Sequence, residues 1–193
     1  MLDRLTGSSA GLNLTTMSLS LTCWPETPDA PGQGAVAVIR VPQVAPRSEL
    51  GLLARACVLR ILGSWGFTSA SFLETATGPR LAGCGELALS LAYTPDCAWI
   101  ALAKGRSVGI DATAIGDFAE LREVAHAYLG PASADIAAAA EPAEAFAAAW
   151  SRHEATLKYH RLRLTEWRTG MPPAPRHLAV RTAGISLSVV LDA

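Results

Sequence analysis

Polar and apolar residues alternate in several short stretches of the chain. Between Met17 and Cys23, leucines alternate with serine and threonine, and leucines recur at every second position over residues 87–91. Residues 35–41 form a run rich in β-branched side chains. A period of two positions is typical of a half-buried strand, and β-branched residues favour strands. We therefore expect three strands in these stretches.

Helical spacing appears in three other stretches. Residues 49–62 carry apolar side chains three and four positions apart, and Gly63 follows them. Residues 117–129 and 134–158 are rich in alanine and other helix-forming residues. Pro142 interrupts the last stretch, and proline breaks a helix interior. The pattern predicts a helix before Gly63 and a helical region later in the chain that is broken at Pro142.

Two hairpins are predicted. The apolar runs 98–103 and 108–111 flank a short polar connection, and the second run ends at Asp111. The runs 177–180 and 185–191 follow a proline-rich linker and predict a hairpin at the end of the chain. A charged residue is not needed to pack an apolar strand, so Asp111 is either a functional carboxylate or an aspartate that caps a turn or helix.

Composition restricts the class of protein. The chain has 193 residues, half of them hydrophobic, so it can bury a core without disulfides or metal ions. The formal net charge of −1 gives no reason to expect nucleic acid or an anionic membrane as partner. The four cysteines form no C-x-x-C pair, which favours reduced thiols in a cytoplasmic protein. No stretch reaches the roughly 18 to 20 apolar residues of a membrane span.

The charges change sign along the second half of the chain. Acidic residues predominate from 117 to 144, and basic residues from 152 to 168. The basic segment suits an acidic macromolecule or phosphate groups. At the other end of the chain, residues 1–16 lack the apolar run of a secretory signal. Because Met17 is a plausible start of the protein, we expect these residues to be a disordered extension.

One predicted helix carries a tryptophan, a glutamate and a lysine at intervals of four residues. Glu154 lies four residues after Trp150 and four before Lys158, so the three side chains share one side of the helix. The simplest interpretation is an ion pair within the helix, next to a tryptophan that packs the helix onto its sheet. The upstream Asp111 favours a second interpretation, in which the carboxylates of Asp111 and Glu154 act together.

The pattern Val-Gly-Ile-Asp at 108–111, followed by Trp-Ser-x-x-Glu-Ala-x-x-Lys at 150–158, resembles the signature of the 4'-phosphopantetheinyl transferase superfamily, in particular its single-chain type. The resemblance covers about residues 50 to 165 and includes a Gly-Pro-Arg segment that ends at Arg80. It implies an α+β fold of two pseudo-symmetric halves, each a small antiparallel sheet with packed helices, and a cleft between them. We expect the halves to cover residues 17–112 and 113–193.

The resemblance also implies a reaction. Such enzymes transfer the 4'-phosphopantetheine arm of coenzyme A to a serine of an acyl or peptidyl carrier protein, with magnesium, in polyketide, nonribosomal peptide or fatty-acid synthesis. Asp111 and Glu154 would be the magnesium ligands, since this ion prefers carboxylates together with substrate phosphates and water. Lys158 would stabilise the leaving phosphate, and Glu154 or a metal-bound water would take the serine proton.

Further residues are candidates for binding coenzyme A. Arg80 and an arginine of the first helix, Arg55 or Arg47, are expected to contact its phosphates, because a guanidinium binds phosphate in bidentate fashion. His153 occupies the position of a family lysine. Its imidazole could meet a phosphate when protonated, and the alternative is a solvated helix histidine.

The sequence departs from the family pattern at two further positions. Thr113 stands where single-chain members carry an acidic residue, and Leu91 stands where the family has a histidine that contacts coenzyme A. A leucine cannot bind phosphate. These departures leave a second hypothesis open, in which a transferase-like protein with weakened or lost catalysis acts as a coenzyme A-binding or regulatory partner of a synthase. For either function we expect a monomer.

Overall fold

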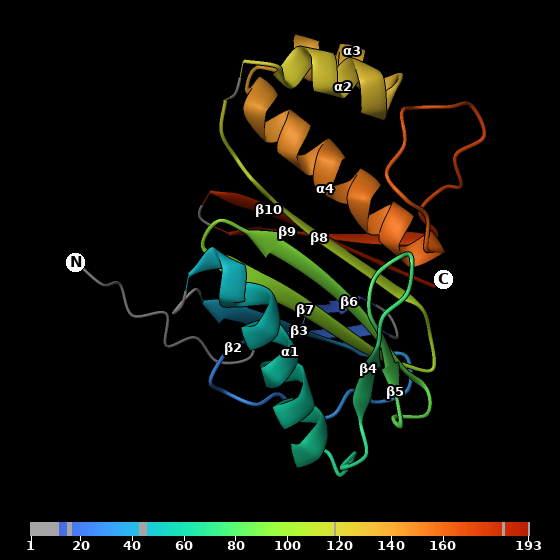
Figure 1. Ribbon diagram of the computed structural model, residues 1–193. Helices are drawn as coiled ribbons and strands as arrows, with labels where there is room; N and C mark the ends of the chain where they lie inside the picture. Colours follow the sequence, from blue (N-terminus) through green and yellow to red (C-terminus); the bar gives the residue numbers. More distant parts are fainter. Residues whose placement is uncertain (1–11, 15–16, 43–45, 118, 183, 193) are drawn as a thin grey trace.

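The computed structural model describes residues 12–14, 17–42, 46–117, 119–182 and 184–192. The fold is mixed α+β, as predicted (Figure 1). In chain order the elements are β1 (Leu12–Leu14), β2 (Met17–Cys23), β3 (Val36–Pro42), α1 (Arg47–Ser64), β4 (Ser71–Leu73), β5 (Arg80–Ala82), β6 (Leu87–Thr94), β7 (Cys97–Lys104), β8 (Val108–Ala114), α2 (Leu121–Leu129), α3 (Ala132–Ala138), α4 (Pro142–His160), β9 (Arg176–Thr182) and β10 (Ile185–Leu191).

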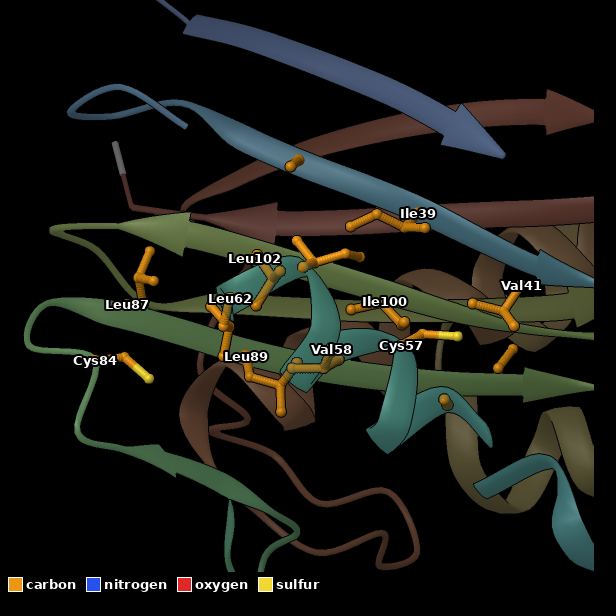
Figure 2. Close-up of a cluster of buried hydrophobic side chains, with 14 of the residues drawn as sticks. Ile39, Val41, Cys57, Val58, Leu62, Cys84, Leu87, Leu89, Ile100 and Leu102 are labelled. Atoms are coloured by element: carbon orange, nitrogen blue, oxygen red, sulfur yellow. The ribbon is translucent and has the colours of Figure 1, made fainter. Parts of the chain in front are cut away.

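The first sheet has the strand order β1-β2-β3-β7-β6, and α1 covers one of its faces. Strands β2 and β3 are parallel, while the other neighbours in this sheet are antiparallel. Ile39 and Ile100 from the sheet pack against Val58 and Leu62 of α1 (Figure 2). Burial of such large side chains contributes about 1.5 to 3 kcal/mol each, so this layer is a main source of stability.

The second sheet has the strand order β8-β10-β9 and is antiparallel throughout. One face packs on the first sheet, where Val38 and Trp99 share a buried cluster with Ile110 and Leu187. Helix α4 covers the other face, and α2 and α3 pack on α4 (Figure 1). The layers therefore run from α1 through the two sheets to α4 and then to α2 and α3.

Most of the predicted elements are confirmed. Strands form over Met17–Cys23, Val36–Pro42 and Leu87–Thr94, and α1 occupies the predicted helical stretch. The later helical region is divided before Pro142, which becomes the first residue of α4. Proline fits there because the first helical N–H has no partner within the helix. The final hairpin of β9 and β10 is also confirmed.

The predicted hairpin of residues 98–103 and 108–111 is wrong. Strand β7 lies between β3 and β6 in the first sheet, so both of its edges are already hydrogen-bonded. Strand β8 pairs with β10 in the second sheet. The polar connection therefore crosses from one layer to the next instead of turning within a sheet. Local alternation could not distinguish the two arrangements, because β7 is buried along nearly all of its length.

Two boundaries expected from the sequence can be located in the structure. Leu12–Leu14 form β1, which corrects the expectation of disorder for these residues, and residues 1–11 and 15–16 lie outside the described part of the chain. The expected division between residues 112 and 113 falls inside β8. The pseudo-symmetry of the halves stays a prediction, since one sheet has five strands and the other has three. Within the described residues, no helix has both the length and the apolar character needed to cross a membrane.

Candidate functional site

Asp111 lies near the middle of β8, beneath α4. Its neighbours Ile110 and Ala112 belong to the buried cluster between the two sheets. Because successive side chains of a strand point to opposite faces, Asp111 lies on the face that α4 covers. The residue is only 8% exposed, so its carboxylate needs polar partners.

Both oxygens of the Asp111 carboxylate have such partners. Lys158 of α4 donates from Nζ to Oδ1 at 2.7 Å, and Thr113 donates from Oγ1 to Oδ2 at 3.2 Å. The strand residue and the helix residue of the two sequence motifs are therefore in direct contact. Thr113 occupies the position at which single-chain transferases are expected to have an acid, and here it supplies a hydroxyl donor to the remaining carboxylate.

Gly109 explains how α4 comes so close to β8. A Cβ atom at this position would lie 2.0 Å from the carbonyl oxygen of Ala155 and 2.6 Å from the backbone nitrogen of Tyr159. Any side chain would therefore push the helix backbone away from the strand. Sequence reasoning identified Gly109 as part of a motif and gave it no role, whereas the structure shows that it sets the distance between Asp111 and α4.

Glu154 completes the group. Its side chain is partly buried, and burial raises the pKa of the carboxyl group. The positive charge of Lys158 opposes this rise, and the negative charge of Asp111 adds to it. Glu154 lies one helical turn before Lys158 on α4, on the same side of the helix. The group therefore consists of the Asp111–Lys158 ion pair and a partly buried carboxyl group on the preceding turn of α4.

A buried network of hydroxyl groups fixes α4 on the second sheet. Ser151 Oγ lies 2.9 Å from Ser188 Oγ and 3.2 Å from Ser186 Oγ, both on β10. His177 Nε2 on β9 lies 2.9 Å from the same Ser188 hydroxyl. Sequence reasoning missed this network. The alternation of Ser186 and Ser188 with apolar residues in a buried strand is the signal that could have indicated it.

Trp150 does not pack α4 onto the sheet, which corrects the expectation from the sequence. Its ring stacks on Phe146 at a centroid distance of 5.5 Å and meets the edge of Tyr128 at 5.7 Å. It belongs to the apolar cluster between α4, α2 and α3. The small residues Ser151 and Ala155 face the sheet instead, because only short side chains fit at the close approach of α4 to β8.

His153 lies near Trp150, at a ring distance of 6.4 Å. It is partly buried, its Nε2 is enclosed without a hydrogen-bond partner, and burial lowers the pKa of the imidazole. A lowered pKa leaves the ring neutral near pH 7, so His153 offers a phosphate a neutral donor and no full positive charge.

Asp111 and Glu154 are the residues that would hold a magnesium ion shared with a substrate. Among the described residues no group of three or more His, Cys, Asp or Glu side chains could hold a metal by itself. Asp111 and Glu154 supply two carboxylates, and magnesium commonly binds to one or two carboxylates plus substrate phosphates and water.

The arginines predicted to bind coenzyme A are not all brought together. Arg55 on α1 forms an ion pair with Glu74 and lies over the ring of Phe72, on the side of the first sheet that faces α1. The side chain of Arg47 lies outside the described residues. Arg80 lines a pocket of about 540 Å³ that also includes Arg161, the residue that ends α4.

Leu91 lies on the opposite side of the first sheet from Asp111. It packs against the apolar cluster beneath α1. Its neighbour Ser90 faces the second sheet, where its Oγ accepts a hydrogen bond from the backbone N–H of Ile110 at 3.1 Å. Strand β6 therefore runs beside β8, and Ser90 contacts the residue next to Asp111.

Comparison with protein families found no family model that matches this chain, and comparison with curated proteins found no matching protein.

Proposed function

We propose that this protein is a magnesium-dependent 4'-phosphopantetheinyl transferase, which moves the phosphopantetheine arm of coenzyme A to a serine of an acyl or peptidyl carrier protein. The observation that carries the proposal is the contact of 2.7 Å between Lys158 Nζ and Asp111 Oδ1, with Glu154 one helical turn before Lys158. The two motifs that resemble the transferase signature thus meet at a single place.

Each residue of the site suits a part of this reaction. In the transfer, the serine oxygen forms a bond to the phosphorus atom that carries the pantetheine arm, the P–O bond to the other phosphate breaks, and adenosine 3',5'-bisphosphate leaves. Glu154 is suited to accept the serine proton, since its raised pKa makes it a stronger base than an exposed carboxylate. Lys158 is suited to stabilise the negative charge that develops on the leaving phosphate.

Magnesium, held by Asp111 and Glu154, would neutralise charge on the pyrophosphate. Asp111 also orients Lys158 through their ion pair, and Thr113 orients the Asp111 carboxylate. These contacts restrict the three side chains before substrate arrives, which reduces the reorganisation that the transfer requires.

The carrier protein is proposed to dock on the basic run between Arg152 and Arg168. The segment after α4 exposes Leu162, Leu164 and Trp167, and Arg163 is exposed among them. Apolar side chains between arginines suit a helix that has both acidic and apolar residues. A cytoplasmic monomer remains part of the proposal.

A second function has support from two observations. Leu91 is part of the apolar packing beneath α1, and Thr113 contributes a hydroxyl in place of a carboxylate. Leu91 in place of the family histidine would weaken the binding of phosphate, and Thr113 in place of the family acid would weaken the binding of magnesium. They favour a coenzyme A-binding or regulatory partner of a synthase in which transfer is slow or lost.

One experiment separates the two functions. The purified protein is incubated with magnesium, coenzyme A and several apo carrier proteins, and the carriers are analysed by mass spectrometry. The transferase proposal predicts that a carrier gains the mass of phosphopantetheine. Binding of coenzyme A without any transfer would support the regulatory function instead.

A further inference from the structure

Three arginines from separate elements line one pocket outside the Asp111 group. Arg80 begins β5, Arg106 lies in the connection between β7 and β8, and Arg161 ends α4. No carboxylate among the described residues forms an ion pair with any of the three. Two acidic residues, Glu86 and Asp192, also line the pocket. Asp192 accepts hydrogen bonds from the Ser107 backbone N–H and from the Tyr159 hydroxyl, and the exposed Glu86 forms no ion pair with any of the three arginines.

The guanidinium group of Arg106 has an N–H donor without a hydrogen-bond partner. Its Nη1 is enclosed and forms no hydrogen bond. The guanidinium group lies against Gly34, where an added Cβ would come within 2.6 Å of Nη2. Gly105 makes similar room for Gln33, since a Cβ there would lie 2.0 Å from Gln33 Nε2. Both glycines have positive φ, so the backbone is shaped to admit two polar side chains at this wall of the pocket.

Arg161 occupies a backbone conformation that favours glycine. Its φ is 57°, and among the residues that the structure describes it is the one non-glycine residue at positive φ. Glycine is the usual residue at this position after a helix, because a side chain there costs about 1 kcal/mol. The arginine is also partly buried, and burial followed by the charge of Arg80 lowers its pKa. Arg80 and Arg161 therefore line the same pocket, and among the described residues neither forms an ion pair with a carboxylate.

We propose that this pocket binds the phosphate groups of a nucleotide-sized ligand through Arg80, Arg106 and Arg161. Guanidinium groups bind phosphate oxygens through paired hydrogen bonds, and three such groups line this pocket. The volume of about 540 Å³ exceeds that of a phosphate ion and falls in the range typical of small-molecule sites. The pocket reaches α4 one turn beyond Lys158. The identification of this ligand as coenzyme A rests on the proposed function, whereas the binding of phosphate groups by the pocket does not.

The test measures binding of adenosine 3',5'-bisphosphate by calorimetry, with adenosine as the probe that lacks phosphate. We expect the bisphosphate to bind and adenosine to bind far more weakly. Arg106→Gln should weaken binding of the bisphosphate by about tenfold or more, whereas Arg122→Gln, which removes an exposed charge on α2, should leave it unchanged.

Arg161→Gly gives a second readout. Glycine is favoured at positive φ, so this variant should have a higher denaturation midpoint than the wild type while it binds the bisphosphate about tenfold more weakly. A role in stability alone would not produce this combination. Equal binding of adenosine and the bisphosphate, no binding of the bisphosphate to the wild type, or unchanged affinity in both pocket variants would overturn the inference. Binding with these properties and no transfer to carriers would leave the pocket in place and contradict the transferase proposal alone.

Discussion

Lys158 Nζ lies 2.7 Å from Asp111 Oδ1, so a helix residue and a strand residue 47 positions apart form one ion pair. The Asp111 side chain is 11% exposed and that of Lys158 is 29% exposed. At this depth the pair is less screened by water than a surface pair, and loss of one partner leaves the other charge without compensation.

We therefore expect Lys158→Met to reduce the free energy of unfolding by about 1 to 3 kcal/mol, since the buried carboxylate loses its charged donor. Lys104→Met is the matched control because Lys104 is exposed at the end of β7, and its effect should be a few tenths of a kcal/mol. Urea denaturation measures both values. Combined with Asp111→Asn, the lysine substitution should cost less than in the wild type, and equal costs in both backgrounds would show that the pair contributes no coupling.

Gly109 should tolerate no side chain. In Gly109→Ala the new Cβ would overlap the backbone of α4 at Ala155, so we expect a loss of about 1 to 3 kcal/mol or more in stability. Gly116→Ala is the control, because a Cβ at Gly116 would have no atom within 4 Å. Chemical denaturation of the two variants measures the difference. Similar stabilities would mean that α4 does not approach β8 as closely as described.

The raised pKa of Glu154 predicts a pH dependence of stability. The folded protein holds the Glu154 proton more tightly than the unfolded chain does, so between the ordinary carboxyl pKa and the raised value the folded state binds more protons. The contribution of Glu154 to stability is therefore fully present below the ordinary pKa and declines as the pH rises through the raised value. Denaturation from pH 4 to pH 8 should show this decline in the wild type, and Glu154→Gln should lack it. Identical pH profiles would exclude a raised pKa.

An acidic residue in place of Thr113 should strengthen the binding of magnesium. Thr113→Glu would add a third carboxylate beside Asp111, where the hydroxyl now donates to Oδ2. We expect this variant to need a lower magnesium concentration for half-maximal transfer, by about tenfold if the added ligand contributes 1.4 kcal/mol. Thr113→Val, which removes the hydroxyl and adds no charge, is the control and should not lower the magnesium requirement. An unchanged requirement in Thr113→Glu would mean that position 113 does not reach the ion.

The sequence was sufficient for the local elements and for the association of Asp111 with α4. Alternation and helical spacing located most strands and helices, because each depends on neighbouring residues. The crossing from β7 to β8 was missed, since strand pairing depends on distant residues such as those of β10. The roles of Gly109 and of the Ser151 network were also missed, because they arise only where α4 meets the second sheet.

The arginines illustrate the same limit. Charge and residue type alone made Arg55 and Arg80 equal candidates for binding phosphate. The structure pairs Arg55 with Glu74 and places Arg80 in a pocket with Arg106 and Arg161. Which arginine retains a free guanidinium depends on its three-dimensional neighbours, and short-range spacing contains no information about them.

The most direct test of the proposed function compares wild-type protein with Glu154→Gln in the transfer of phosphopantetheine from coenzyme A to an apo carrier protein, with and without magnesium. The proposal predicts a mass gain on the carrier serine for the wild type with magnesium, and a loss of about 100-fold or more for Glu154→Gln at unchanged thermal stability or a slightly higher one. Equal magnesium-dependent transfer by both proteins would contradict the role of Glu154, and no transfer by the wild type to any carrier would contradict the transferase itself.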